Sequence, residues 1–576
     1  MAKPDPNETF EQFTRVHRQM VETLMRQFGP GHPVEPPEIF KSLNAGLLQD
    51  IRQFNELQSR YYRSQLELWL NTIGQPEPPA AGGPQAHPGD KRFAAREWSE
   101  LPYFHYLKQA YLLNSSWLME LVESAKLEAA AKRKLRFLTR QLIDAMAPSN
   151  FPATNPEAIK LAAETEGNSV VEGLRNLGAD LEKGRVSMTD EAAFEVGRNL
   201  AVTEGAVIFE NELIQLIQYR PLTETVHQRP LLMVPPCINK FYILDLQPGN
   251  SLVRFALEQG FTVFMVSWRN MPPALGRTTW DDYVEQGVIR AIEVTRAVCG
   301  TERINVLGFC VGGTLLGCAL AVLRARDSSN VEAVTLLASM LDFSDTGEIS
   351  VYVDEAYVHQ AEETYRDGGV MPGQQLATTF ASLRANDLIW YYVVNNYLKG
   401  RQPAAFDLLY WNSDGANLSG AMYAYYVRNM YLENKLREPG RLTMCGAPVD
   451  LGSIGLPAYV LATREDHIVP WQTAYASARL LRGEITFVLA ASGHIAGVIN
   501  PASKNRRNFW LNAAMPDDAG AWLAGASSQP GSWWTHWGAW LKARSGEQVP
   551  ARSPLGGAGY TEIEAAPGRY VKERPV

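Results

Sequence analysis

The stretch Ile304–Leu323 (INVLGFCVGGTLLGCALAVL) restricts the possible folds of this chain more than any other, because it contains no charged residue. It is long and apolar enough for a membrane-spanning helix, and its glycines have the spacing of packed membrane helices. The stretch nevertheless divides into a β-branched start, a glycine-rich turn and a helical continuation. A buried strand followed by a buried helix is therefore the better interpretation, and we expect no transmembrane segment.

Strand-like and helical patterns alternate from Arg229 onward. The predicted strands are Leu231–Val234, Phe261–Ser267, Ile304–Leu307, Val331–Ala338, Ala458–Ala462 and Ile485–Ala490. The predicted helices are Ser251–Gln259, Trp280–Val298, Gly312–Arg326 and Trp471–Leu481. Unbroken apolar strands that alternate with helices predict a mostly parallel central sheet with helices on both faces. Residues 341–439 lack this alternation and are rich in Tyr, Trp and Asn, so we expect them to form a lid or cap insertion.

A glycine-rich turn, Gly308-Phe309-Cys310-Val311-Gly312-Gly313, joins the predicted strand to the predicted helix. The pattern G-x-nucleophile-x-G between a strand and a helix is typical of the nucleophile elbow of the α/β-hydrolase fold. A side chain at Gly308 or Gly312 would collide with the neighbouring strand and helix, and the helix N-terminus favours a thiolate. The turn therefore predicts Cys310 as an acyl nucleophile. The alternative is a buried structural cysteine in a tight turn.

This fold needs an acid and a histidine after the nucleophile, in that order. Asp466 comes after the strand that ends near Ala462, and His494 comes after the strand that ends near Ala490. Both therefore lie at the carboxyl edge of the predicted sheet, where open α/β sheets assemble their sites. We predict His494 as the general base and Asp466 as the acid that orients it, in preference to Glu465. His467 is the rival base and a candidate for the substrate pocket.

The oxyanion hole should combine two backbone N–H groups. One is expected from Val311, the residue after the nucleophile. The other is expected from the loop after the first predicted strand, where Ile238 is our candidate donor. Cys237 in the same loop is either a second functional thiol or a small residue in the wall of the pocket; we assign it to the pocket.

Composition excludes several classes of protein. The chain of 576 residues has a net charge of -8, which argues against a nucleic-acid binder. Its five cysteines include no CxxC pair and no Cys/His spacing typical of zinc, so we predict neither a disulfide framework nor a metal site. The first residues have no apolar core of a secretory signal, which makes the cytoplasm the expected compartment.

The first third of the chain has helical rather than alternating patterns. We expect helices in residues 9–72 and 92–146, a mobile linker over Gly74–Asp90, and a helix-rich segment over Asp180–Phe209. These patterns predict a mainly helical N-terminal domain over residues 1–190 and a catalytic α/β-hydrolase domain over residues 191–576 that includes the lid.

At these motifs the chain resembles the poly(3-hydroxyalkanoate) synthases. The segments that carry the resemblance are PPCINKFYILDLQPGNSLVRF (235–255), VSWRN (266–270), GFCVGGTLLG (308–317), YWNSD (410–414), REDHIVPW (464–471) and SGHIAGVINP (492–501). They span most of residues 230–510. The INKFYILDLQP segment and the length of the chain resemble the class that polymerises short-chain monomers without a second type of subunit.

The resemblance implies catalysis by Cys310, Asp466 and His494. It also implies a 3-hydroxyacyl-CoA substrate such as 3-hydroxybutyryl-CoA, with coenzyme A released as a product and no cofactor. A homodimer and residence on polyester granules in the cytoplasm, with granule-associated proteins as further partners of the N-terminal domain, are implied as well. Two alternatives remain open at this point: a Cys-dependent thioesterase or polyester depolymerase on the same fold, and a non-catalytic protein that coats granules.

Overall fold

The computed structural model describes residues 51–73 and 90–574. The chain forms two compact units: one contains residues up to Glu191 together with Thr378–Ala405, and the other contains Ala192–Ala377 together with Phe406–Val576. Almost all of the predicted linker, residues 74–89, lies outside the described residues, as does the N-terminal part of the helices predicted over residues 9–72. No helix in the described ranges is long and apolar enough to cross a membrane.

The second unit is organised around a sheet whose six central strands run parallel. In spatial order these strands are β13 (Ile485–Ala490), β12 (Ala458–Thr463), β7 (Val331–Leu337), β6 (Ile304–Phe309), β4 (Leu231–Val234) and β5 (Val263–Trp268). All six correspond to predicted strands. Nearly every residue in them is buried, as expected for strands covered on both faces.

Antiparallel strands extend the sheet at both edges. They are β14 (Asn508–Leu511) and β15 (Ser527–Pro530) beyond β13, and β2 (Ile214–Tyr219), β1 (Gly205–Glu210) and β17 (Glu564–Ala565) beyond β5. The prediction of a helix-rich segment over Asp180–Phe209 was wrong over most of its length, because α8 ends at Lys183, only a short 3-10 turn (Glu191–Ala193) follows, and β1 occupies residues 205–210. Short edge strands carry too few residues for a clear periodicity, and they form only because neighbours in space pair with them.

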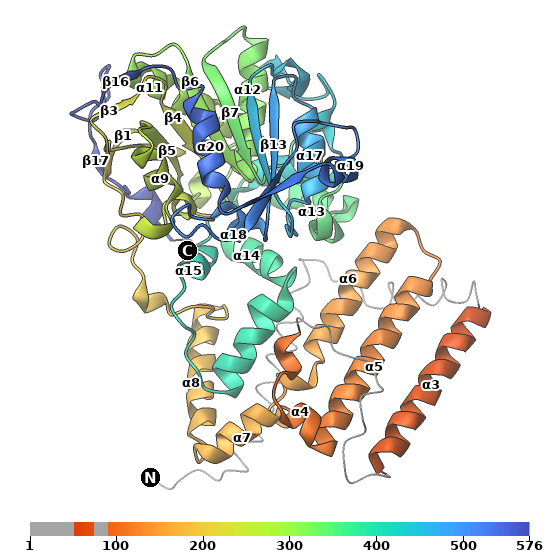
Figure 1. Ribbon diagram of the computed structural model, residues 1–576. Helices are drawn as coiled ribbons and strands as arrows, with labels where there is room; N and C mark the ends of the chain where they lie inside the picture. The colour runs from red at the N-terminus through yellow and green to blue at the C-terminus, as the bar shows by residue number, and fades with distance from the viewer. Residues whose placement is uncertain (1–50, 74–89, 575–576) are drawn as a thin grey trace. The chain divides into compact units, whose positions relative to one another are not determined.

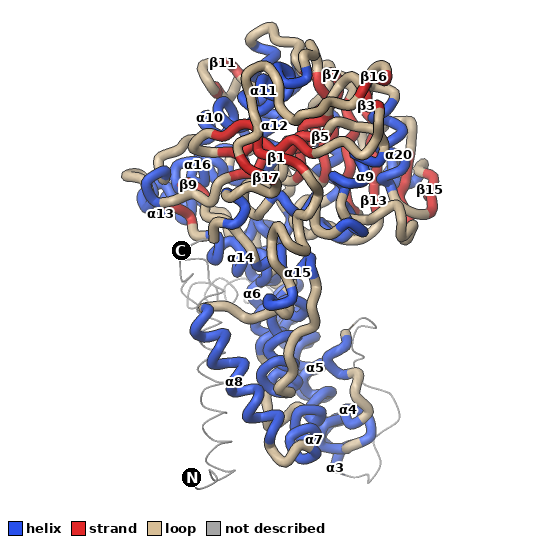
Figure 2. Tube along the Cα trace, turned by 90° about the vertical axis from the view of Figure 1, so that its left-hand side faces the viewer, coloured by secondary structure: helices blue, strands red, loops and turns tan. Residues whose placement is uncertain are grey.

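Helices cover both faces of this sheet (Figures 1 and 2). Figure 2 shows α11 (Arg290–Cys299) and α12 (Val311–Ala325) on one side and α9 (Leu252–Glu258) and α20 (Trp533–Lys542) on the other. The latter two helices contact each other through Phe255, whose ring centroid lies 5.5 Å from that of Trp534. The predicted parallel sheet with helices on both faces is therefore confirmed, and the apolar stretch that begins at Ile304 is a strand followed by a helix.

The first unit is helical. Its helices are α3 (Ile51–Ile73), α4 (Glu97–Glu100), α5 (Pro102–Ser124), α6 (Ala129–Ala145), α7 (Pro156–Glu164) and α8 (Asn168–Lys183). They are joined by two π-helical turns from a distant part of the chain, η9 (Asn386–Trp390) and η10 (Val393–Leu398). The side chains of Ile389, Trp390, Val393 and Tyr397 form one buried cluster with Ala145 and Leu177. Residues 378–405, which were predicted to be part of the lid, thus find their apolar partners among the N-terminal helices.

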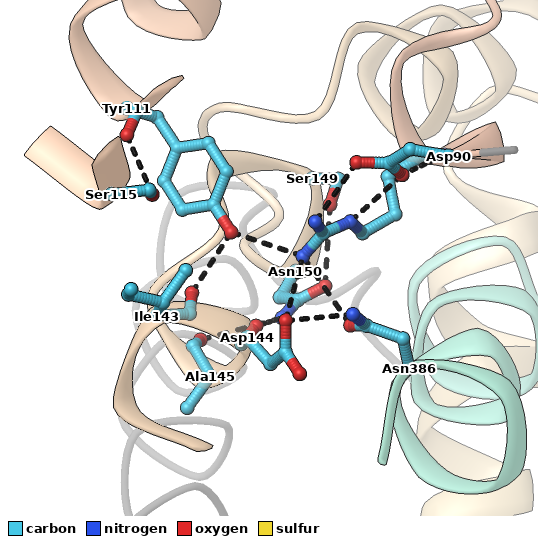
Figure 3. A network of polar contacts seen from close by, with 10 residues as sticks. Asp90, Tyr111, Ser115, Ile143, Asp144, Ala145, Ser149, Asn150 and Asn386 are labelled. Atoms are coloured by element: carbon cyan, nitrogen blue, oxygen red, sulfur yellow. Dashed lines mark hydrogen bonds and ion pairs between the residues drawn. The ribbon is translucent and has the colours of Figure 1, made fainter. Parts of the chain in front are cut away.

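Buried and half-buried polar groups reinforce this association within the first unit (Figure 3). Asn386 donates a 2.7 Å hydrogen bond to the Asp144 carboxylate, and the Arg92 guanidinium contacts Asn386, Asp144 and Tyr111. Farther along, the Tyr397 hydroxyl donates a 2.7 Å hydrogen bond to the Asp180 carboxylate. Because unsatisfied buried polar groups are costly, these bonds fix the register of residues 386–397 against the N-terminal helices.

Substitution of two glycines on α8 provides a test of the packing between α8 and residues 386–397. A Cβ atom on Gly173 would lie 1.9 Å from the backbone oxygen of Tyr397, whereas a Cβ on Gly178 would meet no atom within 4 Å. We expect Gly173→Ala to lower the free energy of unfolding by about 1–3 kcal/mol through overpacking. Gly178→Ala should raise it by roughly 0.5–1 kcal/mol, because alanine favours the helix. Denaturation midpoints measure both effects, and shifts of the same sign would contradict the packing described.

Candidate active site

Cys310 lies on a strained turn between β6 and α12. Its backbone has φ 53° and ψ -128°, a conformation that residues other than glycine rarely adopt. The turn is sharp because the chain passes close to itself: a Cβ on Gly312 would lie 2.3 Å from the Val234 oxygen, and one on Gly308 would lie 2.5 Å from the Cα of Gly313. The structure therefore forms the tight strand–turn–helix that the glycine pattern predicted, with a half-buried cysteine at its apex.

Asp466 and His494 come together from two adjacent parallel strands. Asp466 comes after β12, and His494 is the first residue of a short helix, α18 (His494–Val498), that comes after β13. The distance between His494 Nδ1 and Asp466 Oδ2 is 2.7 Å, and both side chains are almost fully buried, with 4% and 0% exposure. The sulfur, the imidazole and the carboxylate are thus carried by elements that end at the same edge of the sheet.

The carboxylate of Asp466 has further donors. Its Oδ1 accepts hydrogen bonds from the backbone N–H groups of Ile468 (2.9 Å) and Val469 (2.8 Å), and its Oδ2 accepts one from the Thr463 hydroxyl (2.9 Å). Burial alone raises the pKa of Asp466, but the charge and hydrogen bond of His494 and the two N–H groups outweigh it and lower the pKa. Asp466 is therefore an anion with a fixed orientation.

His494 interacts with both this anion and Cys310. Burial alone lowers the pKa of His494, but the negative charges of Asp466 and Cys310, together with hydrogen bonds to both, raise it to about 10. The ring also stacks on Phe309, the residue before Cys310, with centroids 5.6 Å apart and an angle of 25° between the planes. An imidazole held between a carboxylate and a thiol can accept the proton of that thiol and retain it.

His467, the rival candidate for the general base, lies on the turn after β12, next to Asp466 in the chain. His467 is half-buried on the turn after β12, and its backbone oxygen is 3.2 Å from where a Cβ on Gly347 would be. The carboxylate of Asp466 pairs with His494. His494 therefore interacts with both Asp466 and Cys310, while a pocket role for His467 stays a prediction.

The two expected oxyanion donors lie on neighbouring elements. Val311 is the first residue of α12, a position at which the backbone N–H points out of the helix end. Ile238 is in the loop after β4, a loop that is close to the start of α12 at Gly312. The Ile238 oxygen accepts a 2.9 Å hydrogen bond from the Ala416 N–H, which fixes the peptide plane on the carbonyl side. Their role as donors stays a prediction.

Cys237 is buried in the same loop, with 2% exposure. Burial raises the pKa of the Cys237 thiol, and the nearby charge of Cys310 raises it further. The side chain of Cys237 therefore stays protonated. This state favours a role for Cys237 in the pocket wall over one as a second nucleophile.

Two tyrosines of the lid, Tyr426 and Tyr431, were not singled out from the sequence. The phenol groups of Tyr426 and Tyr431 both interact electrostatically with Cys310. The abundance of tyrosine in residues 341–439 was visible in the sequence. Which of these side chains interact with Cys310 depends on the fold.

Comparison with known proteins identifies the family. The chain matches the family model of the N-terminus of poly-beta-hydroxybutyrate polymerase over residues 89–256 and that of the alpha/beta hydrolase fold over residues 230–501. It is 53% identical to the poly(3-hydroxyalkanoate) polymerase subunit PhaC of Cupriavidus necator over 91% of this chain and 89% of that protein. The chain belongs to the poly(3-hydroxyalkanoate) polymerase family.

Other members of the poly(3-hydroxyalkanoate) polymerase family are similar over most of their length. The subunit PhaC of Rhizobium meliloti is 38% identical over 92% of this chain and 87% of its own length. The poly(3-hydroxyalkanoate) polymerase 1 of Ectopseudomonas oleovorans is 40% identical over 84% of this chain and 87% of its own length. The resemblance inferred from the motifs and the predicted α/β-hydrolase fold are therefore confirmed.

Proposed function

We propose that this protein polymerises 3-hydroxyacyl-CoA into polyhydroxyalkanoate through a covalent acyl-enzyme on Cys310. The observation that carries the proposal is the position of His494, which contacts the Asp466 carboxylate at 2.7 Å and interacts with the Cys310 thiol. Membership of the polymerase family supports the reaction, and the strained turn supports the nucleophile.

In the loading step, the Cys310 sulfur attacks the thioester carbonyl, a new C–S bond forms, and the C–S bond to coenzyme A breaks. His494 holds the proton of the thiol and returns it to the departing coenzyme A sulfur, while Asp466 stabilises the imidazolium. One thioester replaces another, so the step is almost neutral in energy. Coenzyme A is then a product rather than a cofactor, and the proposed steps need no metal ion.

In the elongation step, a hydroxyl oxygen attacks the acyl group on Cys310, a C–O ester bond forms, and the sulfur leaves as a thiolate. His494 takes the hydroxyl proton in this proposal, and Val311 and Ile238 donate N–H groups to the oxyanion in both steps. Water must be kept from the acyl-enzyme, since it would release a free hydroxy acid. The lid, with its buried tyrosines, supplies that protection.

Further parts of the proposal rest on the family. We expect a short-chain substrate such as 3-hydroxybutyryl-CoA, a homodimer, and residence on polyester granules in the cytoplasm. We also expect the domain over residues 1–190 to contact granules, granule-associated proteins or the second protomer.

Incubation of the purified chain with 3-hydroxybutyryl-CoA tests the reaction. We expect coenzyme A release together with insoluble polyester. Coenzyme A release with free 3-hydroxybutyrate would instead indicate a thioesterase or depolymerase. If Cys310 gains no acyl mass and coenzyme A is not released, the protein is a non-catalytic granule coat.

A further inference from the structure

The short helix that carries His494 ends with a carbonyl group that the helix itself cannot satisfy. Gly497 is buried in the last turn of α18, and the last carbonyl groups of a helix have no partner within it. In a longer helix, the donor to the Gly497 oxygen would be the backbone N–H of residue 501. This residue is Pro501, which has no N–H. The Gly497 oxygen therefore needs a donor from another part of the fold.

Two consecutive tryptophans at the start of α20 donate to the end of α18. The indole N–H of Trp533 donates a 3.0 Å hydrogen bond to the Gly497 oxygen. The indole N–H of Trp534 donates a bond of the same length to the Val498 oxygen. Both side chains are buried, with 0% and 2% exposure, so these bonds are made away from bulk water. Two neighbouring side chains of one helix thus bind two neighbouring carbonyl groups of another.

Further contacts fix the same segment. The hydroxyl of Ser532, the N-cap residue of α20, donates to the Asn500 oxygen. On α18, a Cβ atom at Gly497 would lie 2.5 Å from the Cγ2 atom of Thr463. Thr463 is also the residue whose hydroxyl donates to the Asp466 carboxylate. The start of α20, the end of α18 and this carboxylate are therefore linked by close contacts that leave α18 little room to move.

The position of α18 determines where the imidazole lies. His494 is the first residue of this helix, and its Nδ1 atom is 2.7 Å from the Asp466 carboxylate. The ring also stacks on Phe309, which directly precedes Cys310 in the chain, with centroids 5.6 Å apart. A displacement of α18 by about 1 Å would take the bond to Asp466 beyond the normal range of hydrogen bonds.

We propose that Trp533 and Trp534 are positioning residues of the active site: by holding the end of α18, they keep the His494 imidazole on the Asp466 carboxylate. This inference rests on the proposed function and extends it to two residues outside the catalytic triad. Misplacement of a reacting group by about 1 Å can cost roughly a hundredfold in rate, even when its cause is remote. The indole N–H groups carry the proposed role, so replacement of either ring by phenylalanine should weaken it.

The helix α20 also supplies a matched control. Trp537 is equally buried, and its indole N–H donates a 3.0 Å hydrogen bond to the hydroxyl of Thr335 on β7 rather than to α18. Replacement of any of these tryptophans by phenylalanine removes one buried hydrogen bond and some volume, so each variant should lower the denaturation midpoint to a similar extent. Only Trp533→Phe and Trp534→Phe should affect His494.

Two measurements report on the imidazole. The rate at which iodoacetamide alkylates Cys310, followed on the isolated peptide by mass spectrometry, needs no substrate. At pH 7 it should fall by roughly threefold to tenfold in Trp533→Phe and Trp534→Phe and recover at alkaline pH, because a longer contact with Asp466 supports the imidazolium less. For coenzyme A release from 3-hydroxybutyryl-CoA, kcat should fall by roughly tenfold to a hundredfold while KM changes by less than about twofold. Trp537→Phe should leave both readouts close to their original values.

The outcomes separate this inference from the proposed function. An unchanged pH profile of alkylation in Trp533→Phe and Trp534→Phe would overturn the inference, and so would an equal change in Trp537→Phe. Gly497→Ala displaces α18 from Thr463 without touching a tryptophan; it should shift the profile in the same direction, and no shift would also count against the inference. If the unmodified protein releases no coenzyme A, the proposed function fails, while the alkylation profile still decides whether these tryptophans position the imidazole.

Discussion

Replacement of Cys310 by alanine is expected to abolish polymer formation, with a loss of rate on the order of 10⁶-fold, as for removal of the nucleophile from other acyl-transfer enzymes. The change removes only the sulfur that would carry the acyl group. The fold should survive, because alanine is smaller than cysteine and the turn is fixed by its glycines. Release of coenzyme A and precipitation of polyester measure the effect, and mass spectrometry should show that the acyl adduct is lost.

Cys445→Ser provides a matched control for this variant. Cys445 is half-buried on a loop, where its thiol donates to the Asp281 oxygen, and serine retains that donor. We expect this variant to polymerise at close to the original rate. Polymer formation by Cys310→Ala at an ordinary rate would remove the nucleophile from the mechanism.

The second large effect is expected from loss of the Asp466 carboxylate charge that pairs with the His494 imidazole. Asp466→Asn keeps the shape of the side chain but removes the anion that pairs with His494 at 2.7 Å. We expect polymerisation to slow by about 10⁴-fold, the loss seen when the acid of such a triad becomes an amide. Acceptance of the Cys310 proton by His494 should weaken as well, since the anion is the largest of the influences that raise the pKa of His494.

The pKa of His494 determines how the reactivity of Cys310 should change with pH. With Asp466 present, the pKa of His494 is raised to about 10, so the imidazolium that supports a thiolate persists from neutral pH up to that value. Without the anion, the largest influence that raises the pKa of His494 is gone while burial still lowers it, so the imidazolium is lost at a lower pH. Alkylation of Cys310 by iodoacetamide should therefore be slower at pH 7 in Asp466→Asn and recover at alkaline pH. An unchanged pH profile would contradict the charge pairing.

The parts of the site that the sequence predicted share one property: each comes after a strand with an unmistakable apolar pattern. Cys310, Asp466 and His494 lie directly beyond β6, β12 and β13, and the carboxyl ends of parallel strands meet at a common edge of the sheet. Chain order and turn glycines were therefore sufficient to place the three residues near one another, without any knowledge of distances.

The parts that were missed depend on contacts between segments far apart in the chain. The residues around Tyr426 do not predict the π-helical turn η11 (Val427–Leu432) that follows it, and its ring neighbours Trp280 and Phe343 come from distant parts of the chain. Residues 378–405 have an apolar pattern like the rest of the lid, and only their partners Ala145 and Leu177 show that they belong with the N-terminal helices. Local patterns carry no information about the identity of a distant partner.

The membership of residues 378–405 in the first unit has a consequence for how the protein is made. A ribosome completes the N-terminal helices long before it reaches Ile389, Trp390 and Val393, so the apolar surface that these residues cover stays open while much of the second unit is synthesised. The N-terminal unit therefore finishes folding only after the central strands β4 to β7 have emerged. A chain shortened to its first 191 residues would lack that covering permanently and would expose apolar surface of the kind that promotes aggregation.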